Sequence, residues 1–193
     1  MSLSLSVVIC SHNPRHDYLN RVVEALRRQT LSIEDWELLI IDNGSTDPIS
    51  NALDLSWHPA ARHVFEPTLG LTPARIRGIH ESRASTIVFV DDDNVLHPDY
   101  LIHVVELTMQ QPALGAFGAG ELTPEFEERP SKTIVPWLGF LALRTVEDDQ
   151  LSSNFREKHC LPWGAGLCVS RDVANQYIGL VNSLGITSVL DRR

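Results

Sequence analysis

The segment Thr86-Ile87-Val88-Phe89-Val90-Asp91-Asp92-Asp93-Asn94 decides the fold class. Residues 86–90 are all β-branched or aromatic and lack the polar alternation of a half-exposed strand. Continuous runs of this kind are typical of parallel strands that helices bury on both faces. The segment therefore predicts a buried strand of an α/β sheet, and the strand ends at an acidic turn.

Two earlier segments repeat the pattern of an apolar strand followed by a polar turn. Leu5 to Cys10 runs into Ser11-His12-Asn13-Pro14, and Glu37 to Ile41 runs into Asp42 to Asp47, whose Asn-Gly and Ser-Thr-Asp content predicts a turn into a helix. A further short strand is predicted at His63–Phe65. The predicted helices begin at proline or carry apolar residues at helical spacing. The first carries Leu19, Val22, Val23 and Leu26, and the second begins at Pro48 with Asp47 as its N-cap. The third runs from Pro73 to Glu81, and the fourth begins at Pro98 and carries Leu101, Val104, Val105 and Thr108 on one face.

A length of 193 residues suits one well-buried core. We expect a single domain over residues 1–193, in which residues 1–95 form an α/β half with right-handed crossovers between parallel strands. Residues 96–193 are expected to form a less regular half on the same core. This expectation rests on the region after Gly120, where charged, apolar and Gly-rich stretches follow one another without a clear period.

The composition excludes several classes of protein. Sixteen Lys and Arg against 25 Asp and Glu give a formal net charge of −9, the wrong sign for a protein that holds nucleic acid through its phosphates. The stretch from Ile134 to Leu143 is interrupted by Pro136 and Gly139 and falls short of the roughly 20 apolar residues of a membrane span. No signal-peptide pattern and no CxxC spacing occur, so we expect a cytoplasmic location.

The polar turns indicate where a ligand would bind. Predicted strands end in Ser11 to Arg15, in Asp42 to Asp47 and in Asp91 to Asn94. An open α/β sheet binds its ligands outside the carboxyl ends of the strands. We therefore expect the functional site at this edge of the sheet.

Three consecutive carboxylates at Asp91, Asp92 and Asp93 repel one another unless a cation or several hydrogen-bond donors compensate. Mg²⁺ or Mn²⁺ is suited to this task, because it takes one or two carboxylates and completes its coordination with water and phosphate oxygens. The triplet thus predicts a metal ion that bridges a diphosphate to the protein. The other interpretation is a solvated acidic turn with a capping aspartate.

Other residues carry two interpretations each. Asp42 could accept hydrogen bonds from a ribose or a base edge, or it could cap the helix that follows. Arg75 and Arg77 could contact phosphate or a base, or they could pair with Glu81. The segment Trp163-Gly164-Ala165-Gly166 offers a platform for a sugar ring or base, or forms a tight start to a strand.

Several motifs of other enzyme classes do not occur in the sequence. It contains no G-x-G-x-x-G, Walker lysine or G-x-S-x-G motif, which argues against a dinucleotide dehydrogenase, a P-loop enzyme and a serine hydrolase. His12, His16, His80 and His159 show no metal-ligand spacing, so we interpret them as surface or loop residues without a role in the site.

Taken together and in this order, five segments resemble the inverting family 2 glycosyltransferases. They are Ser6–Pro14, Leu39–Asp47, Gly70–Gly78, Phe89–Asn94 and Pro162–Gly166. The resemblance implies a GT-A fold, which is an α/β fold with a Rossmann-like, mostly parallel sheet flanked by helices. It also implies a nucleotide-diphosphate sugar as donor, with a UDP-sugar as the first choice, a DXD-type site for Mn²⁺ or Mg²⁺, and a role in polysaccharide or glycan assembly.

The resemblance makes residues 1–95 the nucleotide-sugar-binding half and residues 96–193 the acceptor-side half of a partial glycosyltransferase domain. It also assigns roles to residues of the nucleotide pocket. By position, Ser11, Asn13 and Arg15 line that pocket and Asp42 contacts the base. Arg75 matches the arginine of the family's Ala-Arg-Asn pattern and would face the nucleotide, although Ile76 stands where the family has Asn.

Further roles concern the metal and the transferred sugar. The resemblance makes Asp91 and Asp92 candidates for the ribose and makes Asp93 the metal ligand. The segment Trp163-Gly164-Ala165 corresponds to the loop that meets the acceptor and the transferred sugar. The acceptor would be a glycan or a lipid-linked molecule, reached from the cytoplasm and peripherally to the membrane.

An inverting transfer needs a carboxylate that takes the proton of the acceptor hydroxyl. In the family this base lies in a Glu-Asp pair beyond the Trp-Gly-Ala-Gly segment, and here no such pair follows that segment. Glu147-Asp148 lies upstream, and Asp172 and Asp191 stand in other contexts. We expect the base beyond Arg193 and a catalytic domain that is truncated at its C-terminus.

Three hypotheses of function follow. The first is a metal-dependent glycosyltransferase that moves a hexose or similar sugar with inversion. The second is a nucleotide-sugar-binding domain without turnover, because the region of the base is missing. The third is a sugar-phosphate nucleotidyltransferase, which would carry a Gly-rich, basic loop that Ser11–Pro14 lacks.

Overall fold

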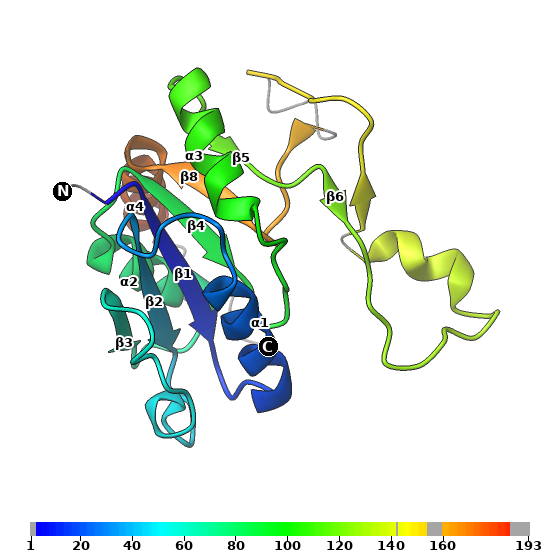
Figure 1. The fold of residues 1–193 in the computed structure, drawn as a ribbon, viewed down its shortest axis with the longest axis horizontal. Helices are drawn as coiled ribbons and strands as arrows, with labels where there is room; N and C mark the ends of the chain where they lie inside the picture. The colour runs from blue at the N-terminus through cyan, green and yellow to red at the C-terminus, as the bar shows by residue number, and fades with distance from the viewer. Residues whose placement is uncertain (1–2, 142, 154–159, 186–193) are drawn as a thin grey trace.

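The computed structural model of the chain describes residues 3–141, 143–153 and 160–185. In these ranges, six strands form one sheet in the order β3-β2-β1-β4-β8-β5 (Figure 1). The strands of this sheet are β1 (Leu5–Ser11), β2 (Trp36–Asp42), β3 (Ala61–Phe65), β4 (Thr86–Val90), β5 (Ala116–Phe117) and β8 (Leu167–Ser170). Strands β1 to β4 are parallel, whereas β8 runs antiparallel to both β4 and β5.

The central strands are buried as their sequences predict. All residues of β2 and β4 are buried, and these strands lie on either side of β1. The register pairs Val8 with Leu39 of β2 and with Phe89 of β4, so apolar side chains stack across the sheet. The predicted α/β class with a mostly parallel sheet is therefore confirmed.

Helices cover both faces of the sheet. On one face, α1 (His16–Arg27) and α3 (Tyr100–Gln110) contribute to a core with the side chains of Leu19, Leu26 and Leu101. On the other face, α2 (Leu71–Glu81) and α4 (Arg171–Leu184) contribute Ala74, Ile79 and Ala174. Gly78 lets α2 approach the sheet closely, because a Cβ at this position would lie 2.5 Å from Cγ1 of Val8.

The helix expected from Pro48 is a single 3₁₀ turn, η1 (Ile49–Asn51). Its expected cap was wrong as well. The N–H of Ile49 donates to Oδ2 of Asp42 at 3.0 Å, and no side chain caps the turn from Asp47. Asp42 can reach this N–H because the chain folds back over the end of β2. Helix α2 begins at Leu71, ahead of the predicted Pro73, since proline is tolerated throughout the first helical turn.

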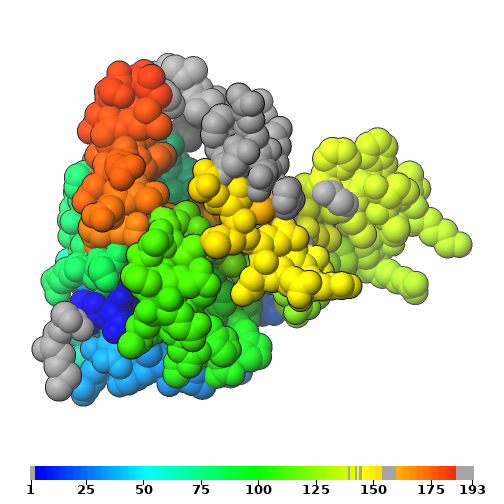
Figure 2. All heavy atoms as spheres, turned by 90° about the horizontal axis from the view of Figure 1, so that it is seen from above, coloured from blue at the N-terminus to red at the C-terminus, as the bar shows by residue number. Residues whose placement is uncertain are grey.

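After β5 the chain leaves the sheet and forms an arm before it returns as β8. The arm, residues 121–153, contains β6 (Glu121–Leu122), the 3₁₀ helix η2 (Val135–Phe140) and β7 (Arg144–Thr145), and β6 pairs with β7. It projects from the body in Figures 1 and 2. Ion pairs of Arg15 with Glu127 and of Arg21 with Glu125 hold it beside the N-terminal part of α1. No helix among the described residues is long and apolar enough to cross a membrane.

Candidate functional site

The carboxyl ends of β1, β2 and β4 meet at one edge of the sheet. Ser11 is paired with Asp42 across β1 and β2, and Ile9 is paired with Val90, the last residue of β4. Asp91 therefore follows β4 at the same level as the end of β1. The parallel register thus places the first three polar turns of the sequence next to one another.

A hydrogen bond joins the first and third of these turns. The hydroxyl of Ser11, which is buried, donates to Oδ2 of Asp92. This contact holds the acidic turn against the end of β1. It also accounts for part of the compensation that three adjacent carboxylates require.

Arg75 brings α2 to the acidic turn. Its Nη2 lies 3.8 Å from Oδ1 of Asp91, and its guanidinium lies 5.5 Å from the centroid of the Phe89 ring. Burial raises the pKa of Asp91 above its ordinary value, and the positive charge of Arg75 acts in the opposite direction. The side chain of Arg75 is three-quarters covered and that of Asp91 slightly more than half covered, so this ion pair is partly shielded from solvent.

Gly164 meets this ion pair from the other half of the chain. A Cβ on Gly164 would lie 3.4 Å from Nη2 of Arg75 and 3.6 Å from Oδ2 of Asp91. The antiparallel pairing of β8 with β4 explains the approach, because Leu167 pairs with Phe89 and the residues before β8 therefore reach the carboxyl end of β4.

Tyr100 fixes the loop that carries Trp163, Gly164 and Ala165. Its hydroxyl donates to the carbonyl oxygen of Gly166. Residue 166 has a φ of +71° and has no room for a side chain, because a Cβ there would lie 2.7 Å from the Tyr100 oxygen. Trp163 is 45% exposed and Ala165 is half-buried. The loop is thus held at its base, and the Trp163 that it carries is partly exposed to solvent.

A hollow of about 290 Å³ lies next to this cluster, between the ends of β1 and β2 and the start of α2. Its lining residues are Cys10, Ser11, His12, Asn43, Leu69, Gly70, Leu71 and Ala74. His12, interpreted from the sequence as a surface or loop residue, is exposed and lines this hollow, and its Nδ1 lies 2.8 Å from the carbonyl oxygen of Asn43.

Asn43 organises the wall of the hollow, and the sequence interpretation missed it. Its amide nitrogen donates to the carbonyl oxygens of Glu66 (3.1 Å) and Thr68 (2.7 Å), and its Oδ1 accepts from the N–H of Gly70 (2.8 Å). Asn43 is 4% exposed. The Asn-Gly pair in the sequence indicated only a turn, whereas the side chain also connects the end of β2 to the segment that leads into α2.

Of the seven residues predicted to bind the nucleotide-sugar, only Ser11 is among the lining residues of the hollow. Asn13 and Arg15 make their polar contacts elsewhere. Asn13 has a φ of +48° and its Oδ1 accepts from the N–H of Thr46 at 2.8 Å, so it stabilises the neighbouring turn. Arg15 is directed elsewhere: its guanidinium contacts Asp17, and Glu127 of the arm. The structure thus gives Asn13 a positioning contact and gives Arg15 a contact between α1 and the arm.

Asp42 lies under the turn that follows β2. Its carboxylate accepts from the N–H groups of Ser45 (2.9 Å) and Ile49 (3.0 Å), and the residue is 6% exposed. Although desolvation by burial acts to raise the pKa of Asp42, the two N–H groups lower it below its ordinary value. The carboxylate is therefore ionised and fixed at the edge where a base or ribose would have to approach.

The acidic turn offers hard oxygen ligands for a cation. Asp93 is exposed, and its Oδ1 accepts from Nδ2 of Asn94 at 3.0 Å. Oδ1 of Asn94 is buried and finds no hydrogen-bond donor among the described residues, so an acceptor oxygen stands unpaired beside the carboxylate. No group of three or more His, Cys, Asp or Glu in the described ranges is arranged to enclose a metal. This donor set fits a divalent cation that brings most of its ligands as water and phosphate oxygens.

Comparisons with known proteins bear on the family of the chain. The model of the family described as Glycosyl transferase family 2 matches residues 6–170. Over 105 residues, the chain is 34% identical to the validoxylamine A glucosyltransferase of Streptomyces hygroscopicus subsp. jinggangensis, an alignment that covers 52% of this chain and 24% of that enzyme.

Solved structures share the fold. Residues 1–349 of S. aureus TarS superpose with a TM-score of 0.57 at 14% identity, over 67% of this chain and 39% of that chain. The mannosyltransferase PcManGT of Pyrobaculum calidifontis superposes with a TM-score of 0.56 at 20% identity, over 63% of this chain and 36% of that one. The chain thus spans about a quarter of the length of the glucosyltransferase and less than two fifths of either solved chain.

Proposed function

The chain belongs to glycosyl transferase family 2, and from this premise we propose that it binds a nucleotide-diphosphate sugar at the carboxyl ends of β1, β2 and β4 and transfers the sugar, with inversion, to an acceptor hydroxyl. The nucleoside would occupy the hollow lined by His12, Asn43 and Gly70. The acceptor, a glycan or lipid-linked molecule, would approach past Trp163.

One observation carries the proposal. Arg75 of α2, Asp91 after β4 and Gly164 before β8 come from three parts of the chain and meet within contact distance of one another. Arginine is well suited to hold a diphosphate, and a glycine without a side chain leaves room for a ligand at the ion pair. The cluster thus joins a group that can hold the donor to the loop that would hold the acceptor.

The divalent cation would be held by Asp93, with the unpaired Oδ1 of Asn94 beside it. When bound, Mn²⁺ or Mg²⁺ would neutralise the charge that develops on the departing nucleoside diphosphate. Arg75, which pairs with Asp91, would add a positive charge beside the acidic turn. The hydrogen bond from Ser11 holds Asp92 against the end of β1.

The carboxylate that accepts the proton of the acceptor hydroxyl is assigned to none of the candidates in the sequence. Asp172 lies in the first turn of α4, after Ser170, which pairs with Thr86 at the opposite end of β4 from Asp91. Glu147 and Asp148 follow β7 on the arm and are exposed. Asp191 lies outside the described residues.

The ligands of the structural neighbours support the class of donor. TarS has been crystallised in complex with UDP-GlcNAc, and PcManGT in complex with GDP-Man and Mn²⁺. A nucleotide-diphosphate sugar with a divalent cation is therefore the ligand combination to test first on this chain.

The test is calorimetric titration of UDP, then of UDP- and GDP-sugars, with and without Mn²⁺. We expect binding that depends on Mn²⁺ and that weakens at least tenfold in Asp93→Ala, because the variant removes the carboxylate that would hold the cation. Asp149→Ala, which removes an exposed carboxylate of the arm, is the matched control and should bind like the parent chain. Equal binding by Asp93→Ala, or no binding of any nucleotide with Mn²⁺ present, would contradict the proposal.

Turnover is tested separately, by following release of the nucleoside diphosphate in the presence of glycan acceptors. Release that accompanies sugar transfer supports a transferase. Tight, Mn²⁺-dependent binding without release would instead identify a nucleotide-sugar-binding domain.

A further inference from the structure

The tip of the arm, residues 129–141, exposes a cluster of large apolar side chains. Trp137 is 64% exposed and Phe140 is 83% exposed, and their rings stack with 5.9 Å between centroids. About half of each of three further side chains is exposed, those of Ile134, Val135 and Leu141. The tip belongs to the yellow-green segment that projects from the body in Figure 2. An apolar surface of this kind marks a site of interaction.

The short helix η2 presents these side chains. The N–H groups of Ile134 and Val135 donate to the carbonyl oxygen of Ser131, at 2.9 and 3.2 Å, and the N–H of Trp137 donates to the carbonyl oxygen of Ile134 at 2.8 Å. Pro136 has no N–H to satisfy. Backbone donors that are already bonded can leave water at little cost, which is a requirement for a segment that enters an apolar medium.

The tip is positively charged in a chain that is negatively charged overall. Residues 129–146 contain Arg129, Lys132 and Arg144 and no acidic residue, whereas the whole chain has a formal net charge of −9. The side chains of Arg129 and Lys132 are exposed. Glu128 is exposed as well and offsets one of these charges, so an excess of two positive charges accompanies the apolar side chains.

The other acidic residues of the arm do not cancel this excess at the tip. Glu125 and Glu127 form ion pairs with arginines at the N-terminal part of α1. Glu121 and residues 147–149 lie at the root of the arm, where β6 pairs with β7. At physiological ionic strength, charges more than about 8 Å apart are largely screened from one another. Because the arm projects from the body, its tip can meet a charged surface while the acidic body stays farther from that surface.

The size and composition of the tip favour a membrane surface over a protein partner. A specific protein interface buries about 800 Å² on each side and takes roughly 20–30 residues, whereas the tip offers five exposed apolar side chains on one projecting turn. A membrane surface needs fewer, because aromatic rings settle at the level of the headgroups, aliphatic side chains reach the acyl chains, and basic side chains meet anionic lipids. We propose that the tip inserts its apolar side chains into the headgroup layer of a membrane that contains anionic lipids and attaches the chain peripherally to it. This attachment requires no donor ligand and is independent of sugar transfer.

The test is co-sedimentation of the 193-residue chain with vesicles in about 0.15 M salt. One set of vesicles is phosphatidylcholine alone, and the other contains about 30% phosphatidylglycerol. Each basic residue near an anionic surface strengthens binding several-fold, so we expect an apparent affinity at least tenfold higher for the anionic vesicles. No sedimentation with either kind of vesicle, or equal affinity for both, would overturn the proposal.

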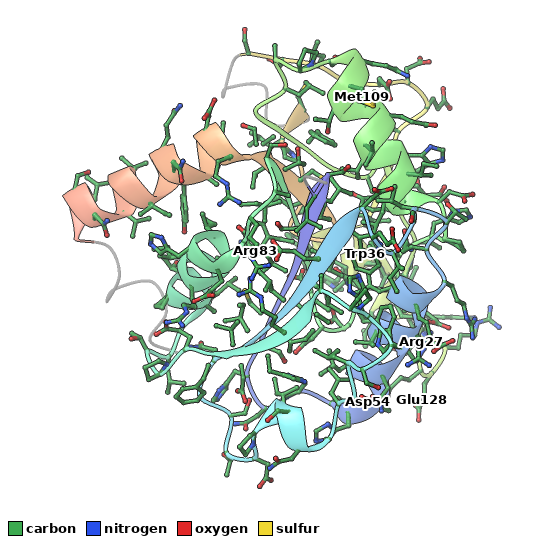
Figure 3. The ribbon with its side chains drawn as sticks, turned by 60° about the vertical axis from the view of Figure 1, so that its left-hand side comes forward. Arg27, Trp36, Asp54, Arg83, Met109 and Glu128 are labelled. Atoms are coloured by element: carbon green, nitrogen blue, oxygen red, sulfur yellow. The ribbon has the colours of Figure 1, made fainter. Side chains whose placement is uncertain are left out.

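A double variant tests whether the tip makes the contact. Trp137→Ser with Phe140→Ser should lower the affinity for anionic vesicles at least tenfold and leave UDP binding unchanged. Met109→Ser with Leu180→Ser is the matched control, because these side chains are 78% and 56% exposed on α3 and α4. Figure 3 shows Met109 far from Glu128, the residue before the tip. Equal loss in both double variants, or no loss in the tip variant, would overturn the proposal.

A charge variant tests the preference for anionic lipid. Lys132→Gln should weaken binding to the anionic vesicles several-fold and leave any binding to phosphatidylcholine alone unchanged. Arg28→Gln, at a position whose side chain is 69% exposed on the body, is the control and should bind like the parent chain. An equal loss in Lys132→Gln and Arg28→Gln would show that the net charge of the whole chain matters, and not the charge of the tip.

Two further measurements need no double variant that folds. Lipids with brominated acyl chains quench tryptophan fluorescence, and Trp137→Phe should bind the vesicles like the parent chain but lose most of the quenching. Quenching that persists in Trp137→Phe would place another of the four tryptophans at the membrane and overturn the proposal. In sedimentation velocity without vesicles the parent chain should be monomeric. Self-association that Trp137→Ser alone abolishes would instead assign the tip to an interface between two copies of the chain.

Discussion

Asn43→Asp is the sharpest test of the wall of the hollow at the ends of β1 and β2. The substitution keeps the shape of the side chain and replaces the amide nitrogen by an oxygen. In the parent chain the amide nitrogen of Asn43 donates to the carbonyl oxygens of Glu66 and Thr68, at 3.1 and 2.7 Å, and the residue is 4% exposed. In the variant a carboxylate oxygen would face two carbonyl oxygens in a site with little water.

The magnitude follows from these contacts. The loss of two hydrogen bonds lowers the free energy of unfolding by about 1 kcal/mol each, and burial of the unpaired carbonyl groups lowers it by about 1 kcal/mol or more. We therefore expect the free energy of unfolding to fall by about 3 kcal/mol. In a domain of this size that loss lowers Tm by about 6–12 °C. The hydrogen bond from the N–H of Gly70 to Oδ1 is retained. Protonation of the new carboxyl restores one donor, so the loss should shrink as the pH falls toward about 4.

The assays are urea unfolding at pH 7.5 and pH 5, and calorimetric titration of UDP with Mn²⁺. Asn20→Asp, an exposed position on α1, adds the same charge elsewhere and should stay within about 0.5 kcal/mol of the parent chain. UDP binding should weaken in Asn43→Asp alone, because the segment that it anchors lines the hollow. If Asn43→Asp unfolds within about 0.5 kcal/mol of the parent chain at both pH values, the side chain does not hold the wall and our account of the hollow is incorrect.

Three further predictions concern the frame of the site. Gly78→Ala places a Cβ 2.5 Å from a side chain of β1 and should lower the free energy of unfolding by about 1–3 kcal/mol. Gly179→Ala meets no atom within 4 Å and should raise the free energy of unfolding by up to about 1 kcal/mol, so urea unfolding that ranks the two variants in the reverse order would refute this prediction. The pKa of Asp42 is lowered in the folded state, so its contribution to the free energy of unfolding is present above the unfolded pKa of about 4 and is lost as the pH falls through the folded pKa. Asp42→Asn should therefore flatten the acid limb of a curve of stability against pH, and an unchanged limb would count against this role of Asp42. Tyr100→Phe removes the hydroxyl that donates to Gly166 and should lower the free energy of unfolding in urea by about 1 kcal/mol. In a transfer assay it should raise KM for the acceptor more than KM for the donor, and an equal effect on the two KM values would oppose the role proposed for this loop.

The sheet could be predicted from the sequence because its determinants are local. Runs such as residues 86–90 lack polar alternation, and parallel register then follows from the helices between them. The edge that holds the site follows from the same pattern, since the polar turn after each strand is adjacent to it in sequence. Ser11, Asp42 and Asp91 could therefore be selected before the structure was known.

Residues whose roles depend on distant partners could not be predicted in this way. Asn43 binds carbonyl groups 23 and 25 residues away, and an Asn-Gly pair indicates only the turn that it begins. Arg15 also contacts Glu127, which is 112 residues away on the arm, and nothing in the sequence indicated this contact.

The arm leaves the sheet after β5 and returns to it at β8, and these two strands are hydrogen-bonded neighbours. Its two ends are therefore fixed side by side whatever lies between them. Under such an arrangement the entropic penalty of closing the loop grows only with the logarithm of its length, by about 0.6 kcal/mol for each doubling. Insertions and deletions in the arm should consequently leave the sheet and the acidic turn intact, so the arm is free to diversify during evolution while the carboxyl ends of the strands stay the same.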